Sequence, residues 1–131
     1  MATQYPDLQV FGDSVAEELA FAADQRGGDG VAARDSGAQL LAELGIGGDI
    51  LSRSTWALSS GERRLVQVTS ALVTPASAVA LDEPTCGLDA TRGRALAGIL
   101  RRAAQSVPLA IATQDPELPR RIGATVWQLG P

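Results

Sequence analysis

A short apolar run that ends in two adjacent carboxylates is the feature that most constrains this chain. Residues 79–81 (VAL) are continuously apolar, and residues 82–89 read DEPTCGLD. A continuous apolar run of this length is typical of a strand that is buried in a parallel sheet. A carboxylate at the end of such a strand suits Mg²⁺, which is bound by one or two carboxylates and several other oxygens. The segment therefore predicts an α/β fold with a candidate site at the strand end.

The rest of the chain alternates between helical and strand patterns. Ser14 with Glu17, and Ser59 with Glu62, each match the capping box that starts a helix. Gly45 suits the end of a helix, and residues 27–30 suit a surface loop. The predicted helices span 15–23, 31–44, 60–73 and 90–105, and the predicted strands span 79–81, 109–112 and 124–129. This order of elements predicts an α/β domain with a parallel sheet, preceded by an all-helical part.

Size and charge exclude several classes of protein. The chain has 131 residues, which is at most one domain of ordinary size, and a net charge of −4, which argues against binding nucleic acid. Its single cysteine, Cys86, cannot form an internal disulfide, so a reducing compartment is expected. No apolar run is long enough to span a membrane. We therefore expect a cytosolic location, and a peripheral role at a membrane stays open.

Two motifs together resemble the ATP-binding-cassette (ABC) ATPases. Residues 58–62 (LSSGE) are similar to the signature motif, and residues 79–89 are similar to the Walker B strand and the D-loop. The family consensus has a second glycine where Ser60 stands. In this family the signature motif contacts the γ-phosphate of ATP across a dimer interface. The resemblance therefore implies a nucleotide-binding set made of Ser59, Ser60, Gly61 and Glu62.

The resemblance implies roles for five more residues. Asp82 corresponds to the Mg²⁺-binding carboxylate and Glu83 to the catalytic base that acts on the attacking water. Asp89 corresponds to the D-loop aspartate, and Gln114 stands where the family has its switch histidine. Because glutamine cannot carry a positive charge or shuttle a proton, sensing of the γ-phosphate would be weakened. Gln4 corresponds to the Q-loop residue, near Mg²⁺ and nucleotide.

The order of these motifs predicts an incomplete P-loop NTPase-type parallel sheet with an α-helical signature lobe. We expect residues 1–57 to form the Q-loop and helical lobe, and residues 58–131 to form the signature, Walker B, D-loop and switch part. The segment from 4 to 18 is most similar to cobalt-type and energy-coupling-factor importer ATPases. The 131 residues contain no G-x-x-x-x-G-K-[ST] motif, no lysine and no histidine. A P-loop binds phosphates through backbone N–H groups and its lysine, so ATP turnover by this chain alone would be impaired.

Three interpretations follow. The chain is an ATPase subunit or fragment of a membrane importer, or a non-catalytic half-cassette that donates its signature motif in trans to a partner ATPase. The third is a decayed or mis-started reading frame. The implied ligands are ATP and Mg²⁺. The implied partners are a second ABC ATPase subunit and an integral membrane transporter subunit, with no nucleic acid.

A few residues are expected to have only structural roles. Arg63 and Arg64 are expected on a solvated helix face, and Trp56 and Trp127 are expected to anchor side-chain packing. Cys86 is expected to be a small turn residue, because no Lys or His lies near it to lower the pKa of its thiol.

Overall fold

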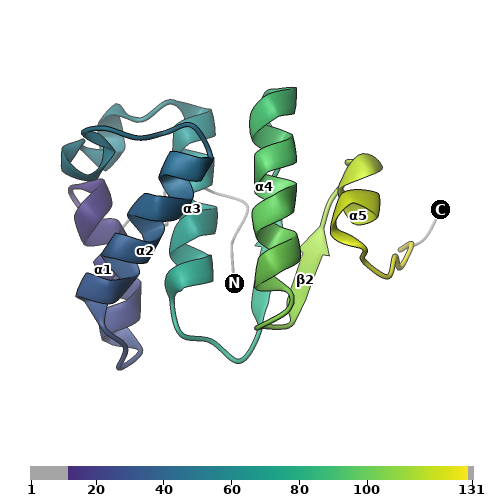
Figure 1. The fold of residues 1–131 in the computed structure, drawn as a ribbon, viewed down its shortest axis with the longest axis horizontal. Helices are drawn as coiled ribbons and strands as arrows, with labels where there is room; N and C mark the ends of the chain where they lie inside the picture. Colours follow the sequence, from purple (N-terminus) through teal and green to yellow (C-terminus); the bar gives the residue numbers. More distant parts are fainter. Residues whose placement is uncertain (1–11, 130–131) are drawn as a thin grey trace.

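The computed structural model describes residues 12–129 and confirms the α/β class. Figure 1 shows α1, α2 and α3 grouped at one side, α4 beside them, and β2 and α5 at the other side. The elements in chain order are α1 (Val15–Gln25), α2 (Gly30–Glu43), the 3₁₀ turns η2 (Ile50–Ser52) and η3 (Thr55–Ala57), α3 (Ser60–Val73), β1 (Val79–Asp82), α4 (Ala90–Ala103), β2 (Leu109–Ala112) and α5 (Glu117–Ile122).

The sheet in the described part of the chain consists of β1 and β2, which pair in parallel. Val79 is opposite Leu109 and Asp82 is opposite Ala112, so the two strands end together. Helix α4 connects them. Whatever follows the two strands is therefore brought to the same edge of the sheet, which is where α/β folds place ligands.

Both predicted capping boxes are present. The Ser14 side chain accepts from the Glu17 N–H and the Glu17 carboxylate accepts from the Ser14 N–H, which satisfies two N–H groups at the start of α1. The same reciprocal pair opens α3. Helix α2 ends at Glu43 with Leu44 as its C-cap, and the next residue, Gly45, has a φ of 76°, which lies in the left-handed region that glycine adopts without strain.

Helices α1, α2 and α3 pack against one another at one end of a single hydrophobic cluster that extends to α4 and α5. Leu19 of α1 is fully buried, and it lies so close to α2 that a Cβ atom added at Gly37 would be 2.8 Å from its Cδ1. On α4, Leu96, Ile99 and Leu100 are buried, as the helical periodicity predicts. The cluster contains mostly Leu, Val and Ile side chains.

Three expectations were wrong. Residues 124–129 are exposed and form no strand, because no neighbouring strand in the described part of the chain offers them backbone hydrogen bonds. Gly30 is not in the surface loop but is the buried first residue of α2. Trp56 and Trp127 do not anchor the packing, since they are 64% and 83% exposed.

Among residues 12–129, no helix is both long enough and apolar enough to cross a membrane.

Candidate functional site

The signature-like segment forms the N-terminal turn of α3. Ser59 is the N-cap: its hydroxyl accepts from the Glu62 N–H at 3.2 Å, and its own N–H donates to the Glu62 carboxylate at 2.9 Å. The N–H groups of Ser60 and Gly61 have no hydrogen-bond acceptor among the residues that the structure describes. Unsatisfied N–H groups and the positive end of the helix dipole favour an anion at this position.

Glu62 is bound from two sides. Besides the Ser59 N–H, its carboxylate accepts from Arg53, with Nη1–Oε1 and Nη2–Oε2 distances of 3.1 and 3.4 Å. The Ser59 N–H bond and then the Arg53 guanidinium lower the pKa of Glu62 below its ordinary value. Glu62 therefore stays ionised around neutral pH. From the sequence alone there was no reason to assign Arg53 a role at this site.

Glu83 follows the last residue of β1 and has an unusual backbone. Its N–H donates to Ala112 O at 2.8 Å, which continues the pairing of β1 with β2 by one residue. Its φ is 46°, and among the non-glycine residues that the structure describes it alone has a positive φ. This conformation costs about 1–3 kcal/mol for an ordinary residue, and such strain clusters at functional sites. The strained backbone falls on the residue for which the resemblance implies the role of base.

The Glu83 carboxylate lies against the segment that follows β2. Its Oε2 accepts from Thr113 Oγ1 at 3.2 Å, and its Oε1 accepts from the Gln114 N–H at 2.9 Å. The structure therefore brings together Glu83 and Gln114, two residues to which the resemblance gives roles in catalysis, and it does so through the backbone N–H of Gln114. Thr113 was missed, although its place directly after a strand that runs parallel to β1 was a usable signal.

The segments that follow β1 and β2 are joined by a second hydrogen bond. The segment that follows β1 also lies close to the start of α3. Thr85 Oγ1 and Asp115 Oδ2 lie 3.3 Å apart. A Cβ atom added at Gly61 would be 3.6 Å from Gly87 O, so the start of α3 lies beside the turn after β1. Asp89 caps α4, where its carboxylate accepts from the Arg92 N–H at 2.8 Å.

Asp82 is the other carboxylate at this edge, and no hydrogen bond to its carboxylate is found within residues 12–129. Its backbone carbonyl accepts from Arg64 Nη1 at 3.2 Å. Arg64 is therefore not on a solvated face as expected, because it is half-buried and binds α3 to β1. No three Asp, Glu, Cys or His side chains in the described region gather as a metal site. A single half-buried carboxylate nevertheless fits Mg²⁺, which takes most of its ligands from phosphates and water.

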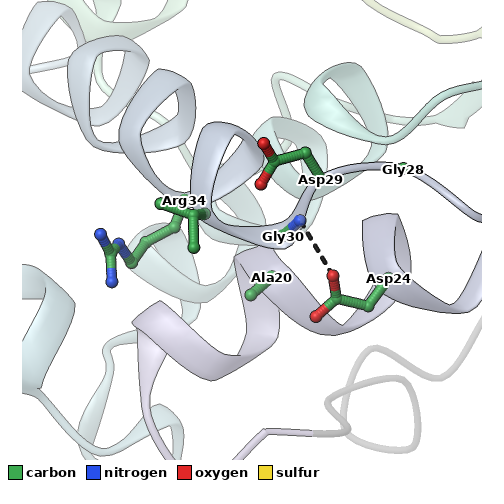
Figure 2. Close-up of a pocket in the computed structure, with 7 residues that line it drawn as sticks. Ala20, Asp24, Gly28, Asp29, Gly30 and Arg34 are labelled. Carbon is green, nitrogen blue, oxygen red and sulfur yellow. Dashed lines mark hydrogen bonds between the residues drawn. The ribbon is translucent and has the colours of Figure 1, made fainter.

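A hollow between α1 and α2 is lined by side chains that stabilise the start of α2, and it does not have the features of an anion-binding site. Figure 2 shows Asp24 and Asp29 beside the first turn of α2, with Arg34 pointing away from both. Asp24 accepts from the Gly30 N–H at 2.9 Å, and Asp29 accepts from the Ala32 N–H at 3.1 Å. The carboxylates already cap this helix, so an anion would be repelled here.

Two remaining predictions fall elsewhere. Gln4, the predicted Q-loop residue, lies outside the described residues. Cys86 is exposed in the turn after β1 and is not in a disulfide, which agrees with a turn residue.

Comparisons with known proteins point to one family. The energy-coupling factor transporter ATP-binding protein EcfA2 of Streptococcus sanguinis is 33% identical over 115 residues, which cover 86% of this chain and 41% of that protein. No protein-family model matches. The chain spans well under half the length of the curated relatives it matches, since the matches cover 29% and 41% of two of them.

Solved structures agree. CbiO1 of Clostridium perfringens, described as part of the ABC transporter complex CbiONQ, is 28% identical with a TM-score of 0.65 and covers 88% of this chain and 47% of its own. The dimeric bacterial ABC transporter cassette MJ0796 has a TM-score of 0.74 at 18% identity, covers 91% of this chain and 53% of its own, and supports the fold alone. From the motifs, the relatives and the fold together, the chain belongs to the ATP-binding domains of the ABC family, among which it is similar to energy-coupling-factor ATPases.

Proposed function

We propose that this chain works as part of the ATPase of a membrane importer, and that its signature residues bind the γ-phosphate of an ATP molecule in a site shared with a second ABC ATPase subunit. The observation that carries the proposal is the start of α3, where the Ser60 and Gly61 N–H groups have no acceptor within the described part of the chain. Two free N–H groups at the N-terminus of a 14-residue helix suit a phosphate.

The names of relatives support a role in a membrane transporter. EcfA2 is named as an energy-coupling factor transporter ATP-binding protein, and CbiO1 is described as part of the ABC transporter complex CbiONQ. By analogy, we propose that the chain assembles with an integral membrane subunit at the cytoplasmic face of the membrane. Residues 1–57 would supply the helical lobe of the cassette, and residues 58–131 its signature and Walker B part.

The residues at the sheet edge have proposed roles in turnover. Asp82 would bind Mg²⁺, Glu83 would orient and deprotonate the attacking water, and Gln114 would act as a weakened switch. Asp89 would reach the dimer interface and Gln4 would complete the nucleotide site. Mg²⁺ itself would neutralise charge on the β- and γ-phosphates.

The phosphates need a further set of ligands. The 131 residues contain no P-loop motif and no lysine, so the groups that bind the α- and β-phosphates lie outside this stretch, in the same or another polypeptide. The second candidate function is donation of the signature in trans to a partner ATPase, which needs only the Ser60 and Gly61 N–H groups of this chain. In that case Glu83 of this chain would take no part in turnover.

Gly61→Ala tests the use of the signature. A Cβ atom at position 61 meets its nearest atoms at ordinary van der Waals distance, so the fold should accept it without loss of stability. The same methyl group would lie in the path of a phosphate that approaches the helix N-terminus. We expect the steady-state ATPase rate of the purified assembly to fall at least about tenfold, as when one donor to a developing charge is lost.

Gly98→Ala is the matched control. Gly98 is also inside a helix, α4, and nothing lies within 4 Å of a Cβ atom added there. This variant should leave the ATPase rate unchanged and gain roughly 0.5–1 kcal/mol of stability, because Gly98 lies in the middle of its helix. Equal rates for the Gly61 and Gly98 variants would show that the signature does not contact nucleotide.

A further inference from the structure

Arg53 contacts both the start of α3 and the segment that leads into α1, which are far apart in sequence. Its guanidinium binds the Glu62 carboxylate with both terminal nitrogens, and Nη2 also donates to Ala57 O at 3.3 Å. Its side chain is only 33% exposed and that of Glu62 is 20% exposed. A paired fork of this kind between arginine and a carboxylate fixes orientation as well as distance.

The backbone of the same segment binds the entry to α1. Arg53 O accepts from the Val15 N–H at 3.1 Å, and Ser54 forms an antiparallel bridge with Ser14. The neighbouring Thr55, which is 1% exposed, donates from its N–H to Asp13 O at 3.1 Å.

The entry segment also packs closely against its neighbours. Thr55 Oγ1 donates to Gly12 O at 2.8 Å, and a Cβ atom added at Gly12 would be 2.5 Å from Glu18 N. The Gly12 N–H also donates to the Glu18 carboxylate at 3.0 Å. Residues 12–15 are therefore joined to residues 53–55 by both backbone and side-chain hydrogen bonds.

We propose that Arg53 is a positioning residue that fixes the N-terminal turn of α3, with its Ser60 and Gly61 N–H groups, relative to the segment that leads into α1. The guanidinium contacts neither N–H group. It acts through Glu62, whose carboxylate accepts from the N-cap Ser59 N–H and so sets the direction in which the first turn of α3 begins. The kinetic consequence rests on the proposed function, and the structural consequence does not.

The first measurement is NMR of the whole chain. Arg53→Gln should shift the amide signals at the start of α1 (Ser14, Val15) and at the start of α3 (Ser60, Gly61) together. It should also raise the pKa of Glu62 toward its ordinary value, because one of the two groups that lower it is lost. Arg53→Lys should cause smaller changes in both the amide signals and the pKa of Glu62, because a lysine can still pair with the carboxylate. If Arg53→Gln leaves the Ser60 and Gly61 signals in place, the proposal is wrong, whatever the assembly does.

The second measurement is the ATPase rate of the purified assembly with Mg²⁺-ATP. Arg53→Gln should lower kcat roughly three- to tenfold with little change in KM, because displacing a group by a fraction of an ångström weakens contacts made in the transition state. In a Glu62→Ala background the same substitution should have no further effect.

Arg102→Gln is the control, since it removes an exposed ion pair of Arg102 with Glu43 that also joins distant segments. It should change neither the amide signals nor the rate. If Gly61→Ala lowers the rate and Arg53→Gln does not, the positioning role is refuted while the proposed function stands. If neither substitution changes the rate, the proposed function fails, and the NMR result alone decides the role of Arg53.

Discussion

Glu83→Gln is expected to abolish ATP turnover in an assembly in which this chain supplies the base. Loss of a general base lowers the rate by about 10²–10⁴-fold, so single-turnover hydrolysis should fall at least about 100-fold. The fold should be unaffected, because a glutamine at position 83 can still accept from the Gln114 N–H and contact the Thr113 hydroxyl. Nucleotide binding should therefore survive while hydrolysis stops.

Glu117→Gln provides a control with the same change in charge. Glu117 is the first residue of α5, and its carboxylate forms an exposed ion pair with Arg120. Exposed pairs contribute little, so hydrolysis and stability should both stay as in the unmodified chain. Full turnover by the Glu83 variant would mean that another carboxylate acts on the water and that this chain only donates its signature.

Leu19→Ala is expected to cost about 2–5 kcal/mol of folding free energy, which is a large part of the stability of a small domain. Leu19 is fully buried between α1 and α2, with its methyl groups against Gly37. Alanine would leave a cavity that the close packing of the two helices cannot fill. Urea unfolding followed by circular dichroism should show a lower midpoint with an unchanged slope.

Val31→Ala on α2 is the comparison for Leu19→Ala. Val31 is 60% exposed, so the same kind of truncation removes little buried surface and should leave the midpoint within about 0.5 kcal/mol. Similar midpoints for the two variants would mean that α1 and α2 do not pack in solution as they do in the structure.

Local chemistry explains which parts of the fold were predictable. The two capping boxes and the glycine just after the end of α2 depend on residues that lie close together in sequence, and all were confirmed. The strand expected at 124–129 depends on a neighbouring strand that sequence pattern cannot supply. The burial of a tryptophan likewise depends on what packs over it, so Trp56 was assigned to the interior in error.

The candidate site divides in the same way. That Glu83 and Gln114 meet follows from two parallel strands ending at one edge, and it was predictable from their order. The bond of Thr113 to Glu83 and the bond of Arg53 to Glu62 join residues 30 and 9 positions apart in sequence. The place of Thr113 directly after β2 was a usable signal for the first bond, whereas the pairing of Arg53 with Glu62 depends on the packed geometry and no periodicity in the sequence points to it.

The left-handed backbone at Glu83 lowers the folding stability of the chain as long as a glutamate occupies this position. Asparagine and glycine adopt a positive φ at lower cost than glutamate, so either replacement would relieve the strain at this position. Selection of variants for heat resistance alone would therefore tend to remove the carboxylate. Any programme of thermal engineering on this chain would need to hold position 83 constant.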